Sequence, residues 1–182
     1  MVRYKYLLTL SFLIMTGFSL QSIAQVPVNP IIKDFGTINQ IDGVAPSDKT
    51  IDYKIVIDLK SSNDDFSAVN KGLNNVARLL NLHGAAGIPS DKLHVAVAVH
   101  YTATPIILNN EGYQKKYGVD NPNLQLIDQL TSAGVEIYVC GQSLVARDYA
   151  FKNVNSKIEI GLSMLTVVSE KTMKGYELLV FE

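Results

Sequence analysis

The single cysteine of the chain stands at the end of an apolar segment. Residues 134–143 read Gly-Val-Glu-Ile-Tyr-Val-Cys-Gly-Gln-Ser, which predicts a buried strand ending at Cys140, a tight turn at Gly141 and then a helix. Backbone N–H groups at such a turn favour a thiolate, the reactive form of cysteine. We expect Ser143 to cap the helix, and Gln142 is a candidate to offer its amide to an anion. The sequence leaves two interpretations open, a reactive thiol and a small buried residue.

Polar side chains also follow two other predicted strands. His100 ends one strand, Asp58 stands near the end of another, and Asn63 lies in the loop after it. The carboxyl ends of parallel strands meet at one edge of a sheet, so we expect these side chains to line one crevice with Cys140. A histidine there can take the thiol proton or hold the thiolate as an ion pair. The structural alternative is a histidine bonded to a loop carbonyl, with ordinary loop contacts for Asp58 and Asn63.

Several familiar catalytic and cofactor motifs are absent from the sequence. There is no G-x-G-x-x-G after the first predicted strand, no G-x-x-x-x-G-K-[ST] and no G-x-S-x-G. A single cysteine excludes a C-x-x-C dithiol and an internal disulfide. Three histidines and one cysteine at these separations give no recognisable zinc pattern. We therefore expect neither a cofactor nor a metal.

Alternating strands and helices must position these side chains. Mostly apolar, often β-branched runs predict strands over residues 53–59, 93–100, 134–140, 158–160 and 176–181. An apolar stripe from Phe66 to Leu80 predicts a helix that starts near Asp64 and ends near Gly84. Further helices are predicted over residues 110–117, 121–133, 143–149 and 163–173. This order predicts a single α/β domain with a mainly parallel sheet and helices on both faces.

The composition suits one exported domain. The chain has 182 residues, of which 47% are hydrophobic, enough for one core. A net charge of -1 with scattered Lys and Arg excludes an obvious nucleic-acid or anionic-membrane surface.

Residues 1–24 combine Arg3 and Lys5 with an apolar run and small residues, typical of a cleavable signal peptide; the alternative is an uncleaved anchor. We expect a periplasmic or secreted protein with no membrane contact after cleavage. Residues 25–50 are then an arm, with a short strand near residues 38–41, and residues 51–182 form the domain.

Four segments resemble the DsrE/DsrF-like family, in particular its exported bacterial branch. They are residues 95–100, 113–123, 134–143 with V-C-G-Q-S, and 175–176, and the likeness covers roughly residues 52–181. The resemblance implies a five-stranded parallel sheet between helices and a homotrimer or homohexamer. It also implies that Cys140 carries a persulfide and passes sulfur to a partner. The family often has Gly after the histidine, where this chain has Tyr101.

The leading hypothesis is an exported sulfur-handling protein with a sulfur donor or acceptor protein as partner. Cys140 would accept sulfane sulfur, His100 would assist proton movement, and the amides of the turn at residues 141–143 would hold the charged sulfur. The alternative is a non-catalytic module of the same fold that binds a small ligand or assembles into an oligomer. A third hypothesis is a redox-sensing thiol. Access to Cys140 and the closeness of His100 distinguish these hypotheses.

Overall fold

The computed structural model describes residues 26–181 of the chain. The predicted signal peptide, residues 1–24, lies outside the described residues and stays a prediction. Within the described part, none of the helices has the length and apolar character needed to cross a bilayer.

Five parallel strands form the central sheet in the order β6-β5-β4-β3-β7. Their bounds are Tyr53–Leu59 (β3), Leu93–Val99 (β4), Glu136–Cys140 (β5), Glu159–Gly161 (β6) and Glu177–Phe181 (β7). All five fall within a residue or two of the runs predicted from the sequence, so the predicted α/β fold is confirmed.

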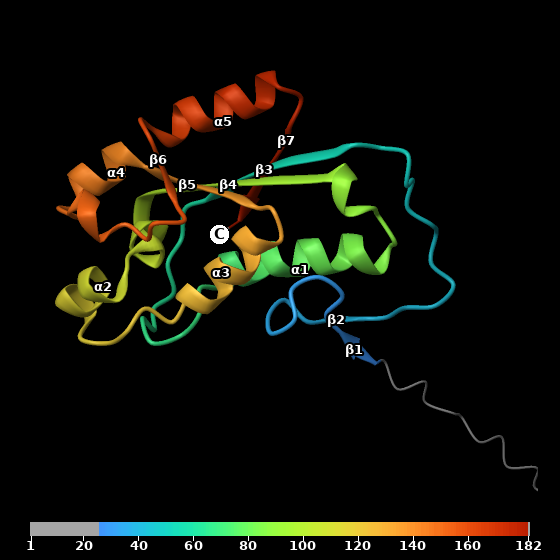
Figure 1. Cartoon of the computed structure of the whole chain (residues 1–182), viewed down its shortest axis with the longest axis horizontal. Helices are drawn as coiled ribbons and strands as arrows, with labels where there is room; N and C mark the ends of the chain where they lie inside the picture. The colour runs from blue at the N-terminus through green and yellow to red at the C-terminus, as the bar shows by residue number, and fades with distance from the viewer. Residues whose placement is uncertain (1–25, 182) are drawn as a thin grey trace, which may run out of the picture.

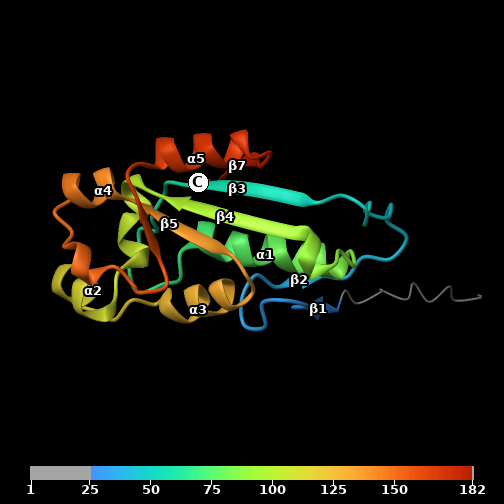
Figure 2. The same cartoon turned by 45° about the horizontal axis from the view of Figure 1, so that its top comes forward.

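Helices cover both faces of this sheet (Figure 1). The pair α1 (Lys71–Ala85) and α3 (Leu124–Ser132) lies on one face, and α5 (Met164–Met173) lies on the other (Figure 2). The short helices α2 (Asn110–Tyr117) and α4 (Gly141–Ala146) lie near the carboxyl ends of the strands (Figure 2). Three 3₁₀ segments complete the chain, at Ser90–Lys92, Tyr101–Ile107 and Phe151–Asn153.

The two faces of the sheet are filled differently. On the α1 side, alternate residues such as Ile57, Val97 and Val139 are fully buried in the main core. Burial of such side chains stabilises the fold by about 1.5–3 kcal/mol each. On the α5 side the central strand β4 carries small residues, and Ala96 and Ala98 are at most 1% exposed. At β4 this side of the sheet therefore lets α5 approach closely.

The first helix of the domain begins later than its apolar stripe predicts. The side chain of Asn70 accepts a hydrogen bond from Leu73 N and caps α1, so the helix does not start near Asp64. Asn63 instead holds the preceding loop: its side chain donates to Val69 O at 2.8 Å and accepts from Lys71 N at 3.0 Å. Local side-chain hydrogen bonds to the backbone outweigh helix periodicity here.

The arm lies against the helices on the α1 side. It contains two short antiparallel strands, β1 (Pro27–Val28) and β2 (Ile38–Asn39), and β2 confirms the short strand predicted near residue 38. The buried side chain of Asn81 on α1 accepts from Ile31 N and Ile32 N at 2.9 and 2.8 Å and donates to three arm carbonyls. These contacts hold the arm against α1.

Candidate functional site

Cys140 ends β5 and is itself the N-cap residue of α4. Ser143 lies inside α4, so the prediction that Ser143 caps this helix is wrong. Cys140 pairs with Gly161 on β6, and a Cβ added to Gly141 would lie 3.0 Å from the Gly161 carbonyl oxygen. The absence of a side chain at Gly141 therefore lets the loop between β6 and α5 pass directly beside the cysteine.

Polar groups at the starts of α4 and α5 lie close to the Cys140 sulfur. Burial raises the pKa of the Cys140 thiol, but hydrogen bonds with the Ser143 side chain, the Met164 and Ser143 backbone and the Ser163 side chain lower the pKa by more than burial raises it. The net pKa lies below its ordinary value of 9.0. The sulfur lies 4.0 Å from the Ser163 Oγ, and Cys140 is only 5% exposed. The site is thus a buried thiol among polar groups that favour its anion.

His100 and Asp58 form a close pair at the same edge of the sheet. Their Nε2 and Oδ1 atoms are 2.6 Å apart, and both side chains are mostly buried. The carboxylate can only accept, so Nε2–H of His100 is the donor. Val99 on β4 pairs with Val139 on β5, and His100 and Cys140 are the residues that follow this pair. Within residues 26–181, however, no hydrogen bond joins His100 to Cys140.

Ser143 connects the histidine loop to the cysteine. The backbone N–H of Tyr101 donates to Ser143 Oγ at 3.2 Å, and the Ser143 side chain is in turn a hydrogen-bond partner of Cys140. Tyr101 has φ 51°, a left-handed conformation that glycine adopts more readily than a residue with a side chain. Its exposed ring lies under the guanidinium of Arg147, 4.9 Å from the ring centroid.

The other residues predicted for the crevice have different positions. Gln142 is exposed on α4, and Gly141 provides the close approach to β6. Asn63 makes its hydrogen bonds to its own loop. The structure therefore brings Asp58 to His100 and Ser143 to Cys140. It also adds Ser163 and Met164, which sequence reasoning missed because their place depends on β6 lying beside β5.

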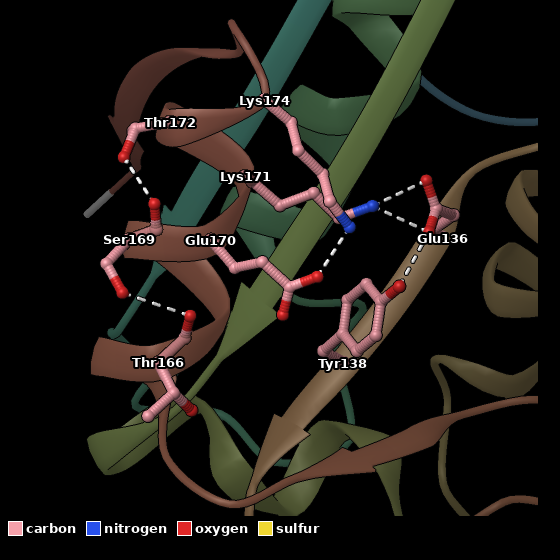
Figure 3. Close-up of polar contacts among 8 residues, drawn as sticks. All are labelled: Glu136, Tyr138, Thr166, Ser169, Glu170, Lys171, Thr172 and Lys174. Atoms are coloured by element: carbon pink, nitrogen blue, oxygen red, sulfur yellow. Dashed lines mark hydrogen bonds and ion pairs between the residues drawn. The ribbon is translucent and has the colours of Figure 1, made fainter.

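A polar cluster anchors α5, the helix that presents Ser163 and Met164 (Figure 3). Lys171 is the one buried residue of α5, and its Nζ lies 2.7 Å from both carboxylate oxygens of Glu136 on β5. Tyr138 donates its hydroxyl to the same carboxylate at 2.6 Å. The ammonium also lies 5.3 and 5.0 Å from the ring centroids of Tyr138 and Tyr176. Charge-assisted hydrogen bonds therefore hold α5 on the sheet.

Neither a metal site nor the cavity between the arm and α3 contributes to the surroundings of Cys140 in the described residues. Within residues 26–181 there is no group of three or more His, Cys, Asp or Glu side chains placed to hold a metal ion. A cavity of about 520 Å³ opens between the arm and α3, lined by residues such as Ile31, Lys33 and Gln129. None of the titratable groups described around Cys140 lines that cavity, so it has no part in the chemistry of the thiol.

A five-stranded parallel sheet covered on both faces, with a thiol and a His–Asp pair at its carboxyl edge, defines a single-domain α/β protein. The chain belongs to the DsrE/DsrF-like family, whose model matches residues 54–181.

Two solved structures resemble the chain. MTH1491 from Methanobacterium thermoautotrophicum, described as a protein of unknown function, has a TM-score of 0.51 at 17% identity over 71% of this chain and 100% of that one. YchN from E. coli has a TM-score of 0.49 at 19% identity over 71% of this chain and 99% of that one. The likeness to MTH1491 supports the fold alone. Comparison with curated proteins gives no match.

Proposed function

We propose that the protein is an exported sulfur carrier in which Cys140 holds a persulfide. The observation that supports this most strongly is the set of hydrogen bonds from Ser143, Met164 and Ser163, which lower the pKa of a thiol that burial alone would raise. A merely structural cysteine has no need of such partners. Membership of a family related to sulfur relay supports the same chemistry.

The proposed reaction is a transfer of one sulfur atom between thiols. The Cys140 thiolate attacks the outer sulfur of a donor persulfide, R–S–SH; the S–S bond of the donor breaks, and R–S⁻ leaves with the electron pair. Cys140 then carries S–SH, and an acceptor thiolate takes the outer sulfur in the reverse sense. Oxidation states balance in each step, so no separate oxidant is required.

Each neighbouring residue has a role in this proposal. Ser143, Ser163 and the Met164 N–H hold the negative charge on the Cys140 sulfur before attack and after release. His100, which Asp58 holds through Nε2, would assist proton movement at the same edge.

Intact-protein mass spectrometry tests the sulfur-carrier proposal. We expect the chain from Gln25 to gain the mass of one sulfur atom after incubation with polysulfide, and Cys140→Ser to gain none. Ser163→Gly removes a hydroxyl next to the sulfur and should reduce the yield of adduct, whereas Ser169→Ala, on the same helix with its hydroxyl bonded to Thr166 O, should not. A folded wild-type protein that gains no sulfur would contradict the proposal.

The alternative, a non-catalytic module that assembles into an oligomer, has its own supporting observation. Large apolar side chains on α5, on the loop before it and on the edge strand β7 are exposed: Leu162 72%, Leu165 73%, Met173 88%, Leu178 43% and Val180 49%. We name these five residues the α5–β7 surface. β7 is an edge strand that pairs only with β3, so its outer side is free within the described residues. Exposed apolar side chains beside such an edge favour association with a second copy of the chain.

Sedimentation velocity tests this self-association. We expect the wild-type domain to be a homo-oligomer and Leu178→Lys to shift it to a smaller species. Leu82→Lys is the matched control, because Leu82 is 49% exposed but lies on α1, across the sheet from α5. A wild-type monomer, or an equal effect of the two variants, would contradict the proposed role of the α5–β7 surface.

Export is proposed from the pattern of residues 1–24. Mass analysis of the protein isolated from the periplasm or medium of an expressing bacterium should find a chain that begins at Gln25. A full-length chain recovered from the membrane fraction would favour the uncleaved anchor instead.

A further inference from the structure

A second cavity lies near the carboxyl edge of the sheet, between α2 and the segment that follows α4. Its volume is about 390 Å³, within the range of roughly 300–1,000 Å³ typical of small-molecule sites. The residues that line it are Gly112, Lys115, Lys116, Arg147, Asp148, Tyr149, Ala150 and Asn153. Cys140 is the N-cap of α4 and Arg147 is its C-cap, so the length of this helix separates the cavity from the proposed sulfur site.

Positive charge around this cavity is not neutralised by the protein. Lys115, Lys116 and Arg147 line it with a single acid, Asp148, and within the described residues none of the three cations forms an ion pair. Aromatic rings hold two of the cations in place without removing their charge. Lys116 Nζ lies 4.3 Å from the Tyr149 ring centroid, and Arg147 stacks on Tyr101. A concave site with unpaired cations concentrates anions.

One residue that lines the cavity has a buried polar atom without a partner. Asn153 is 8% exposed, and its Oδ1 is buried without a hydrogen bond in the part of the chain that the structure describes. Its backbone is fixed on both sides, since its N–H donates to Ala150 O and its carbonyl accepts from Asn109 N. Native proteins leave few buried polar atoms unsatisfied, so this atom, enclosed next to the cavity, lacks the donor that such an atom normally has.

The packing of α2 keeps Asn153 in this position. A Cβ on Gly112 would lie 2.7 Å from the Cβ of Asn153, so a side chain there would force the helix and the asparagine apart. The last turn of α2 carries both lysines, and cations there also complement the helix dipole. The dipole explains neither Arg147, which comes from another element, nor the unpartnered Asn153.

We propose that this cavity binds a small molecule that carries an oxyanion group and, beside it, a hydrogen-bond donor. Arg147 and the two lysines would bind the oxyanion, for which phosphate, sulfate and carboxylate are the chemical candidates. The donor, such as a hydroxyl group, would reach the Oδ1 of Asn153 when the side-chain amide turns toward the cavity. This binding does not depend on sulfur transfer by Cys140.

An NMR titration of the ¹⁵N-labelled domain with inorganic phosphate tests the proposal. We expect saturable shifts at the amides of Gly112, Lys116, Tyr149 and Asn153, and none with sodium chloride at equal ionic strength. Arg147→Gln should weaken binding about tenfold, since it removes a hydrogen-bonded charge. Lys152→Gln should bind like the wild type, because Lys152 pairs with Glu111 and does not line the cavity.

Two further measurements separate the parts of the proposal. Glycerol 3-phosphate, which adds hydroxyl donors, should bind more tightly than inorganic phosphate, and Asn153→Ala should abolish that difference with amide shifts outside the cavity unchanged. Cys140→Ser should bind both probes as the wild type does, so a failure of sulfur transfer leaves this test intact. Shifts that chloride reproduces, or equal losses in Arg147→Gln and Lys152→Gln, would overturn the proposal.

Discussion

Replacement of Lys171 by methionine tests how α5 is held on the sheet. Lys171 is the one buried residue of α5, and its ammonium group contacts both carboxylate oxygens of Glu136 (Figure 3). Lys171→Met keeps an unbranched side chain of similar length and removes the charge. Glu136 and Tyr138 are then left without their cation, while the rest of the helix is unchanged.

The expected loss of stability follows from the exposure of the two partners. Breaking a buried ion pair by removing one partner costs about 3–5 kcal/mol. The Lys171 side chain is 10% exposed, but the Glu136 side chain is 43% exposed, so water replaces part of the lost interaction. We therefore expect Lys171→Met to lower the free energy of unfolding by about 2 kcal/mol at pH 7. Lys174→Met is the control: Lys174 and its partner Glu170 are both well exposed, so the expected loss is much smaller than for Lys171→Met.

Urea unfolding at several pH values gives the decisive comparison. Burial raises the pKa of Glu136, but hydrogen bonds from Lys171 and Tyr138 lower this pKa by more than burial raises it. The net pKa lies below the ordinary 4.5. The pair therefore stabilises the fold fully above pH 4.5, and this contribution is lost as the pH falls through the folded-state pKa. The difference between wild type and Lys171→Met should shrink in that acidic window. Equal losses in Lys171→Met and Lys174→Met, or a difference that persists at low pH, would refute this explanation.

Two other predictions concern the backbone and the arm. Because Tyr101 has φ 51°, Tyr101→Gly should be more stable than Tyr101→Ala by about 1 kcal/mol in urea unfolding, and the reverse order would show that the backbone is not strained there. Asn81→Ala leaves arm backbone groups unpaired, so it should lower the free energy of unfolding by roughly 3 kcal/mol and open residues 26–50 to proteolysis. An arm that stays as protected as in the wild type would contradict the anchoring role of Asn81.

The strands and their shared edge could be predicted from the sequence. Apolar, often β-branched runs mark each strand, and the alternation of strands with helices leaves a parallel sheet as the simplest arrangement. That arrangement is enough to bring Asp58 and His100 to one edge, where they form a pair 2.6 Å apart. The family resemblance and the observed sheet agree on this point.

The partners of the thiol could not be predicted in the same way. Ser163 and Met164 lie more than twenty residues beyond Cys140 in the sequence, and they reach it because β6 pairs with β5 and because Gly141 has no side chain. Strand order within the sheet is a tertiary property that periodicity does not report. The same holds for Lys171, whose partner Glu136 lies on a different strand-and-helix unit.

The central claim is that the structure favours the thiolate of Cys140, and the pH dependence of its alkylation rate tests it most directly. In the folded wild type we expect the midpoint of the rate–pH curve to lie below the ordinary thiol pKa of 9.0, and Ser143→Ala to move the curve toward higher pH. Ser169→Ala should leave the curve in place. A thiol that titrates above 9.0, or that reacts only when the protein unfolds, would contradict the claim and leave Cys140 a structural residue.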